Sequence, residues 1–394
     1  MNYIQQGYKG NTKWFYWVFT ILLVFFGWQV IGVLPLMALA IMNSANIAEF
    51  TKAAEDNFMT LGIDNNLFLF FMILTFIFGL ISLLIGVKYI HKRTFTSLVT
   101  SRKSIDWKRF WFGFIIWGII ASVTIIIGIY LTPENYVWNF KPIPFYTLLV
   151  ISFLFLPFQT SLEELLFRGY FMQGIGISTR SKRFPLIFIY ILLTIISMIF
   201  LSENFGYSFL NMGIVFSAFT VLMFFLFELK SISEIFESNI NISLVSFFNS
   251  KLTPLLITSV VFGLLHGANP EVEKLGYISM VFYIGTGLFY GITTLMDEGT
   301  ELSLGLHAIN NIVAAFFVTT NWTVFQTDAL YVDTSEPSVG WEMFFPVLVL
   351  YPLMLFLFSK KYGWEKWVDK LTGKIEEPVS LKKNYRILED IGTK

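Results

Sequence analysis

Charged side chains are rare in the apolar stretches of this chain, and the first group that could do chemistry lies in the segment SLEELLFRGY at 161–170. Glu164 and Arg168 are four residues apart, so on a helix they share one face and can form an ion pair. Glu163 is turned by about 100° from Glu164 and is left free of that pair. We therefore expect Glu163 to act as a general base, although the segment could also be a purely structural ion-pair cluster.

Two of the three histidines lie in other apolar stretches, each with a partner at helical spacing. Phe262 precedes His266 by four residues, so an aromatic ring is expected beside this imidazole. His307 and Asn311 are also four residues apart, and such a pair of donors could stabilise an oxyanion. Taken singly, these residues could equally be a hydrogen-bonded core histidine and an interhelical hydrogen-bond pair. The third histidine, His91, lies in a basic loop and is interpreted as a solvated residue.

The co-occurrence of these groups is more informative than any one of them. A carboxylate, two imidazoles and an amide, contributed by three separate stretches, are the groups needed to activate water and to stabilise an oxyanion. Ionisable side chains inside membrane helices cost roughly 2.5–3.5 kcal/mol or more each, which is a further reason to expect a function for them. The sequence thus favours hydrolytic chemistry, provided that the three stretches meet.

The composition indicates what kind of protein must position these residues. Of the 394 residues 55% are hydrophobic and only 14% are charged, against about 25% charged residues in ordinary globular proteins. A soluble fold of this size could not cover such a core, so we expect an all-α, polytopic transmembrane helical bundle. This excludes a secreted enzyme, a cytosolic dehydrogenase and a free nucleic-acid binder. The chain contains no Cys, which excludes disulfides, thiol nucleophiles and thiolate metal sites.

Ten apolar stretches are candidate spans, given that about 20 residues cross the bilayer core. They are roughly 14–42, 67–88, 110–131, 144–173, 185–201, 209–227, 253–268, 276–296, 302–320 and 343–358. The first is interpreted as a retained signal anchor. With an N-terminus inside, 23 Lys and Arg residues fall in loops predicted inside, and three, Lys52, Lys141 and Lys274, fall in loops predicted outside. Both termini are therefore predicted to be cytoplasmic.

The predicted spans give a depth for each polar residue. Measured from the cytoplasmic side at 1.5 Å per residue, Glu163 lies about 17 Å deep and His266 about 18 Å deep, whereas His307 is only about 9 Å from Glu301. We therefore expect either that the turn 297–301 dips into the membrane or that the site occupies a cavity open to the cytoplasm.

The three groups also resemble the motifs of a known family. EELLFR at 163–168 is similar to EExxxR, FGLLH at 262–266 to FxxxH and HAINN at 307–311 to HxxxN, in the order found in the CPBP family of CAAX proteases and bacteriocin-processing (Abi) proteins. The resemblance covers roughly residues 144–320. It implies an intramembrane endopeptidase of a bacterial plasma (inner) membrane that cleaves a membrane-associated, prenylated or peptide-type substrate.

The resemblance also implies roles for individual residues. Glu163 is expected to be the general base that activates water, assisted by His266. His307 and Asn311 are expected to form the oxyanion hole. The remaining motif residues are expected to have structural or orienting roles: Glu164, Arg168 and Phe262.

A metal cofactor is left open by the sequence. Family members are described both as metalloproteases and as glutamate-dependent proteases. Glu163, His266 and His307 could ligate zinc with one position left for water. No HExxH zinc motif occurs in the chain. We favour the metal-free route, because Glu163 already supplies a base and Asn311 suits an oxyanion hole better than a metal.

The motifs also suggest a division of the chain. We expect N-terminal transmembrane helices at 1–143, a catalytic membrane core at 144–320 with an inserted helix pair at about 185–252, an outer loop and last span at 321–358, and a cytoplasmic tail at 359–394. Two other functions stay open. One is a proton-coupled transporter that uses the buried Glu and His residues as a relay, and the other is a non-catalytic membrane scaffold that retains the motif residues.

Overall fold

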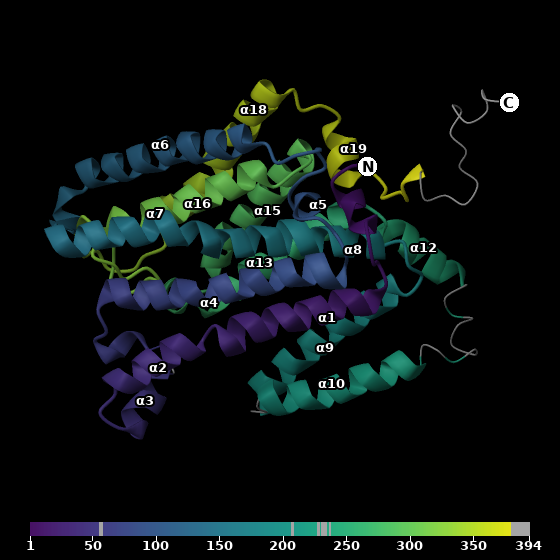
Figure 1. Ribbon diagram of the computed structural model, residues 1–394, viewed down its shortest axis with the longest axis horizontal. Helices are drawn as coiled ribbons and strands as arrows, with labels where there is room; N and C mark the ends of the chain where they lie inside the picture. Colours follow the sequence, from purple (N-terminus) through teal and green to yellow (C-terminus); the bar gives the residue numbers. More distant parts are fainter. Residues whose placement is uncertain (55–57, 206–208, 227–228, 230–234, 236–237, 380–394) are drawn as a thin grey trace.

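The computed structural model is a helical bundle, which confirms the predicted all-α fold class (Figure 1). It describes the chain except for residues 55–57, 206–208, 227–228, 230–234, 236–237 and 380–394. The longer helices are α1 (Trp14–Phe25), α2 (Leu34–Asn43), α4 (Asn65–Ile85), α6 (Trp107–Leu131), α7 (Pro142–Glu164), α9 (Phe184–Phe205), α10 (Phe209–Leu226), α12 (Asn239–Phe248), α13 (Leu252–Leu265), α15 (Met280–Asp297), α16 (Glu301–Phe316) and α18 (Tyr351–Tyr362). The shorter helices are α3 (Ile47–Ala54), α5 (Phe95–Val99), α8 (Met172–Ser178), α14 (Pro270–Leu275), α17 (Trp341–Phe345) and α19 (Trp367–Thr372).

Seven helical stretches of the described chain are long and apolar enough to cross a membrane, or up to eight if the bent pair α12 and α13 is one span. The seven are Trp14–Asn43, Asn65–Ile90, Trp107–Leu131, Pro142–Ser178, Phe184–Ser202, Tyr277–Asp297 and Met343–Tyr362. This is fewer than the ten stretches predicted from the sequence. The difference includes α16, whose 16 residues extend about 24 Å and are too short for a bilayer core of about 30 Å.

Helix α16 is an internal helix that packs against α6 and α7. Its close approach to α6 depends on glycine in both helices, since a Cβ at Gly305 would collide with the carbonyl oxygen of Phe110, and one at Gly113 would lie 2.8 Å from the carbonyl oxygen of Leu302. Small residues allow helix backbones in membranes to approach in this way. The packing fixes the axial position of α16, and with it the level of His307 and Asn311.

One end of the bundle carries most of the described Lys and Arg residues and is called the basic end below. It comprises residues 1–11, 88–109, 179–183, 249–251, 297–301 and 359–379. Hydrogen bonds join these segments: the Tyr3 backbone N–H (2.6 Å) and the Lys370 ammonium (2.8 Å) both donate to the Glu298 carboxylate. In Figure 1 the N-terminus, α5 and α19 lie at this end, on the right. Most of the described Lys and Arg residues that the sequence predicts to be cytoplasmic are thus gathered at this end.

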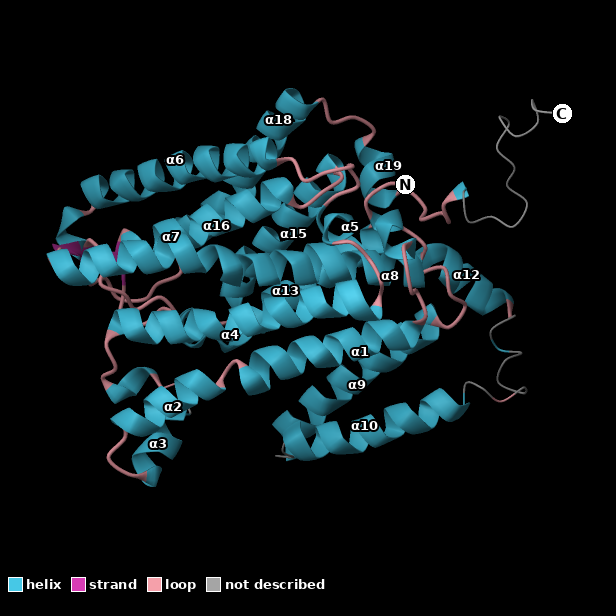
Figure 2. Cartoon of the chain, viewed as in Figure 1, coloured by secondary structure: helices cyan, strands magenta, loops and turns pink. Residues whose placement is uncertain are grey.

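The opposite end holds the only strands among the described residues and is called the sheet end. Strands β1 (Tyr136–Trp138), β3 (Tyr331–Asp333) and β2 (Val318–Thr319) form a sheet in that order, with β1 antiparallel and β2 parallel to β3 (Figure 2). Asn66 Nδ2 donates to the carbonyl oxygen of Pro144 nearby (2.9 Å). The backbone N–H of Val324 donates to Glu271 Oε2 (3.0 Å), which joins the segment 269–279 to the same end.

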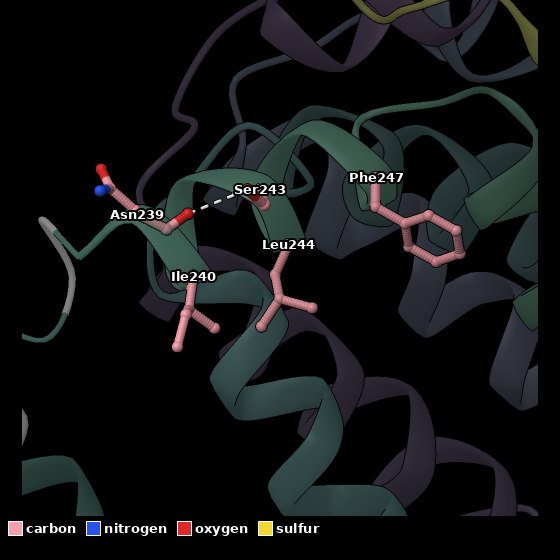
Figure 3. A pocket seen from close by; sticks show the side chains of 5 residues that line it. All are labelled: Asn239, Ile240, Ser243, Leu244 and Phe247. Atoms are coloured by element: carbon pink, nitrogen blue, oxygen red, sulfur yellow. Dashed lines mark hydrogen bonds between the residues drawn. The ribbon is translucent and has the colours of Figure 1, made fainter.

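The predicted insertion at 185–252 contains the helices α9, α10 and α12, and part of it lies outside the described residues. Helices α9 and α10 lie at the edge of the bundle in Figure 1. Helix α12 leaves Ile240 and Phe247 exposed, around a shallow apolar hollow (Figure 3). Of the predicted tail at 359–394, residues 380–394 likewise lie outside the described part.

The interpretation of His91 as a solvated loop residue is wrong. Its side chain is fully buried, with Nδ1 hydrogen-bonded to the carbonyl oxygen of Asn11 (2.8 Å) and Nε2 to the Tyr170 hydroxyl (2.7 Å). A π-helical segment, Gly86–Ile90, continues α4 and brings His91 beneath the N-terminal segment. Burial lowers the pKa of His91, because the charged imidazolium loses its hydration.

Candidate active site

The first motif lies where helix α7 widens into a π-helical segment, Leu165–Phe171, before α8. Such segments often occur at functional sites. Arg168 Nη1 donates to Glu164 Oε1 (3.0 Å), and both side chains are fully inaccessible to solvent. The guanidinium also lies over the Phe262 ring, 4.1 Å from its centroid. The structure therefore contains the ion pair predicted from the i,i+4 spacing, and Glu163 stands outside it.

His307 is held between the two carboxylates of the motif. Its Nδ1 donates to Glu164 Oε1 (2.9 Å), and its Nε2 lies 3.4 Å from Glu163 Oε2. The imidazole also stacks on the Tyr290 ring, with centroids 5.1 Å apart and 28° between the planes. Because a carboxylate accepts at Nδ1, Nε2 is the ring nitrogen that faces Glu163.

His266 is oriented by its own helix turn. Its Nδ1 is 2.8 Å from the carbonyl oxygen of Phe262, which can only accept a hydrogen bond. Nδ1 therefore carries the proton, and in the neutral ring Nε2 is left as a basic nitrogen. The ring stacks on Tyr283, with centroids 4.6 Å apart and 21° between the planes. Phe262 thus orients His266 through its backbone as well as by ring packing (centroids 4.7 Å apart).

A directed chain of hydrogen bonds connects three helices to Glu163. Trp117 Nε1, which can only donate, bonds to Asn310 Oδ1 (3.1 Å), and Asn310 Nδ2 bonds to Asn311 Oδ1 (3.2 Å). Asn311 Nδ2 then donates to Gln159 Oε1 (3.0 Å), and Gln159 Nε2 donates to Glu163 Oε1 (2.6 Å). The carboxylate at the end of the chain can only accept, so every amide orientation is fixed. Asn311 Nδ2 keeps one hydrogen for another acceptor.

These side chains meet at a cavity of about 370 Å³. The four residues predicted to be catalytic all line it: Glu163, His266, His307 and Asn311. Phe262 lines it too, whereas Glu164 and Arg168 lie behind the wall. Glu163 is only 8% exposed, and none of the described residues gives its Oε2 a hydrogen bond. Oε2 is thus an unpaired and nearly inaccessible acceptor, 3.4 Å from Nε2 of His307.

Several residues of the cavity were missed from the sequence. Gln159 lies one helical turn before Glu163 and is a polar residue in an apolar stretch, a signal that could have found it. Tyr283 and Glu271 belong to the wall near His266: the Tyr283 hydroxyl donates to Glu271 Oε1. Tyr290 stacks on His307 from α15. No spacing along the chain relates these last three to the motifs.

Glu163, His266 and His307 are the candidate ligands of a zinc site. Among the described residues no three His, Asp or Glu side chains are placed to hold one metal ion. His307 Nδ1 is taken by Glu164 and His266 Nδ1 by a carbonyl oxygen. These side chains, as they are arranged, do not form a metal centre.

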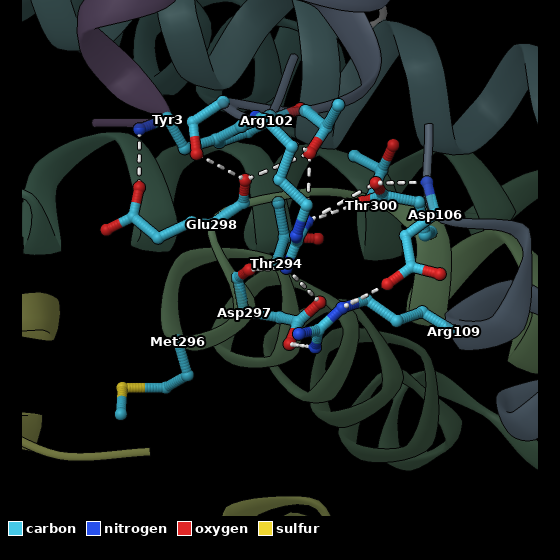
Figure 4. Close-up of polar contacts among 12 residues, drawn as sticks. Tyr3, Arg102, Asp106, Arg109, Thr294, Met296, Asp297, Glu298 and Thr300 are labelled. Atoms are coloured by element: carbon cyan, nitrogen blue, oxygen red, sulfur yellow. Dashed lines mark hydrogen bonds and ion pairs between the residues drawn. The ribbon is translucent and has the colours of Figure 1, made fainter. Parts of the chain in front are cut away.

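A second buried polar group lies at the basic end and does not line the cavity (Figure 4). It consists of Arg102, Asp106, Arg109, Asp297 and Glu301 and is called the basic-end cluster. Arg102 bonds to Asp297 (3.0 Å) and Glu301 (3.1 Å), and Arg109 bonds to Asp106 (3.1 Å) and Asp297. The cluster joins the loop before α6 to the turn between α15 and α16.

Comparison with known proteins adds an independent line of observation. Residues 234–313 match a family model described as type II CAAX prenyl endopeptidase Rce1-like, which confirms the resemblance predicted from the motifs. The match includes the FGLLH and HAINN motifs. The chain is also similar to the uncharacterized protein YyaK of Bacillus subtilis (strain 168), with 24% identity over 275 residues, 70% of this chain and 69% of that protein. No solved structure matches the chain significantly.

Proposed function

We propose that this chain is an intramembrane endopeptidase whose nucleophile is a water molecule activated by Glu163, in line with the match of residues 234–313 to the Rce1-like model of CAAX endopeptidases. The observation that carries the proposal is the convergence of Glu163, His266, His307 and Asn311 on one cavity, with one oxygen of Glu163 unpaired. The substrate is proposed to be a membrane-tethered peptide or protein. The membrane is proposed to be a bacterial plasma membrane, in line with the similarity to a Bacillus protein.

The reaction begins with a water molecule between Glu163 and His266. Glu163 Oε2 accepts a proton from this water while the basic Nε2 of His266 accepts its second hydrogen bond. The water oxygen attacks the carbonyl carbon of the scissile peptide bond and forms a tetrahedral intermediate. The C–N bond then breaks, and Glu163 returns the proton to the leaving amine. The products are a new carboxyl group and a new amine, and Glu163 is a carboxylate again.

The negative oxygen of the tetrahedral intermediate needs hydrogen-bond donors. Asn311 Nδ2 has one hydrogen not used by Gln159, and its orientation is fixed by the chain that begins at Trp117. His307 presents Nε2, because Glu164 occupies Nδ1, and Nε2 is a donor when this ring is doubly protonated. Donors that are held in place before the reaction are worth about 2.7–4 kcal/mol each in comparable oxyanion holes. The pair His307 and Asn311 is assigned this role.

The test is cleavage of a membrane-tethered peptide library by the purified protein in proteoliposomes. The wild type is expected to release products, and Glu163→Ala is expected to release none above background. Glu273→Gln is the matched control, because this carboxylate is exposed and lies outside the cavity; it is expected to retain full activity. Equal activity of the wild type and Glu163→Ala would overturn the proposal.

A further inference from the structure

The cavity lies on one side of the proposed catalytic residues. Helix α4 contributes Leu69 and Phe76 to the wall of the cavity. Gly79 of the same helix packs against Leu162 and so marks the level of Glu163. Leu69 and Phe76 precede Gly79 and therefore lie nearer the sheet end. Helix α16 contributes His307 and residues after it, up to Ala314. Each helix thus lines the cavity with the part that runs from the catalytic level toward the sheet end.

The mouth of the cavity is formed by loops of the sheet end. Val324 and Phe325, which follow β2, line it together with Asn269 and Glu271 from the segment after α13. The hydrogen bond from the Val324 N–H to Glu271 Oε2 holds the two loops side by side. No described residue of the basic end lines the cavity.

In the opposite direction the structure is closed by packed side chains. Leu302 and Leu306 of α16 are completely buried between the cavity and the basic end, and so is Arg168. Beyond them lies the basic-end cluster. A substrate therefore reaches Glu163 from the sheet end or from the lipid beside it, and not through the basic end.

The side of the membrane follows from the distribution of charge. Lys and Arg residues mark the cytoplasmic side of membrane proteins, and the described loops of the basic end contain most of them. We infer that the catalytic cavity opens to the extracytoplasmic side and takes an apolar segment of an exported, membrane-anchored polypeptide. This inference rests on the proposed peptidase function and names its substrate class. It departs from one of the two arrangements expected from the sequence, a cavity open to the cytoplasm.

The ends of two helices set the levels of His266 and Glu163 between the two ends of the bundle. Helix α13 ends at Leu265, so His266 lies at the end of that helix nearest the sheet end. The first motif is followed by helix to Ser178, so more protein lies between Glu163 and the basic end than the sequence suggested.

The lining of the cavity supports the same class of substrate. Apart from Tyr283 and Tyr290, its ionisable residues are Glu163, Glu271, His266 and His307, and no Lys or Arg is among the described lining residues. A substrate that placed its terminal carboxylate in the cavity would therefore meet neither Lys nor Arg among the described residues, and burial of an unpaired carboxylate is costly. The walls contain Leu69, Ile73, Phe282 and Phe325, which suit an apolar segment in extended form.

The chain has no Cys, so single cysteines can report its orientation in the membrane without other changes. Asn321→Cys, in the loop beside the mouth, and Ser338→Cys are exposed at the sheet end, and Ser104→Cys is exposed at the basic end. In intact bacteria a membrane-impermeant maleimide is expected to label the first two variants, and Ser104→Cys only after permeabilisation. Labelling of Ser104→Cys alone in intact cells would overturn the inference and leave the peptidase proposal standing.

The substrate class is tested with two anchored peptides that differ only at the C-terminus, one a free carboxylate and one an amide. Proteoliposomes that contain the full chain are expected to cleave both, with no loss for the amide. A strict requirement for the carboxylate would overturn the inferred substrate class. If neither peptide is cleaved and Glu163→Gln equals the wild type on the whole library, the peptidase proposal itself fails, whatever the labelling result.

Discussion

The wall of the cavity and the basic-end cluster both bury carboxylates beside arginine, but the two sets of carboxylates differ in how many of their oxygens accept hydrogen bonds. In the basic-end cluster Asp297 accepts from Arg102, Arg109 and Trp364 Nε1 (3.1 Å). Glu301 accepts from Arg102 and from the backbone N–H of Asp106 (3.2 Å). Beside the cavity, by contrast, Oε2 of Glu163 and of Glu164 receive no hydrogen bond from any described residue. A saturated cluster is suited to holding segments together, whereas an unpaired oxygen beside a cavity is suited to chemistry.

The two regions also differ in what they connect. The basic-end cluster joins segments that are far apart in the chain (Figure 4), and none of its residues lines the cavity. The proposed catalytic residues come from α7, from the turn that follows α13 and from α16, and a cavity lies between them. Buried charge alone therefore does not identify a catalytic site. The useful signs are the open space and the unpaired acceptor, and the two regions should respond differently to mutation.

The largest expected effect is that of Glu163→Gln on hydrolysis. Glutamine keeps an oxygen for the hydrogen bond from Gln159 but cannot accept a proton, so the rate is expected to fall by about 10²–10⁴-fold. The thermal midpoint is expected to stay close to that of the wild type, because no ion pair is lost. Peptide cleavage and a thermal unfolding scan on the same preparation check both parts, and a large loss of stability would assign Glu163 a structural role.

Asp297→Asn is expected to show the opposite pattern. Two arginines then lose their shared carboxylate in a mostly buried place, and the free energy of unfolding is expected to fall by about 3 kcal/mol. Activity per folded molecule should not change, because Asp297 does not line the cavity. The measurement is a denaturation series in detergent with activity normalised to folded protein. A selective loss of turnover without loss of stability would contradict the division between the two regions.

Gln159→Leu tests whether the amide chain positions the base. Without the Gln159 amide, Glu163 Oε1 and Asn311 Nδ2 each lose a hydrogen-bond partner. We expect kcat to fall by roughly tenfold, which is the size of one lost hydrogen bond to a charged group, and KM to change little. Thr160→Val is the matched control, because this neighbour on α7 bonds only to carbonyls of its own helix. Equal effects of the two variants on kcat would show that Gln159 acts only through packing.

The smallest expected effect concerns His91 and pH. Its pKa is lower in the folded than in the unfolded protein, so the unfolded state binds more protons near and below the ordinary pKa of about 6.5. Stability is therefore expected to fall as the pH drops from 7.5 to 5.5. His91→Gln should have a flatter dependence of the thermal midpoint on pH, by at most a few degrees. An identical slope in both proteins would show that His91 titrates as it does in the unfolded chain.

Much of the fold could be predicted from local patterns. Long apolar runs predicted the membrane helices, and the i,i+4 spacing predicted the pair Glu164–Arg168 and the packing of Phe262 beside His266. These features depend on the period of a single helix, which a sequence displays directly. The length of α16 was not predictable in the same way, because apolar residues continue past Phe316 where the chain turns toward β2.

Other features depend on contacts between distant segments. His91 is buried because Asn11 and Tyr170 reach it from other parts of the chain. Gln159 is linked to Asn311 across two helices, and nothing in either segment indicates the partner. The direction in which the cavity opens depends on the packing of α16 against α6 and on the loops at 269–279 and 320–326. The sequence therefore indicated which residues could do chemistry, but not how they are positioned or from which side they are reached.

The role of Glu163 in activating water is tested most directly by cleavage of a membrane-tethered peptide in water enriched in ¹⁸O, followed by mass spectrometry of the products. The wild type is expected to place one ¹⁸O atom in the newly formed carboxyl group, and Glu163→Gln is expected to yield no product above the background without protein. Labelled product in equal yield from both proteins would contradict the assignment of Glu163 as the base.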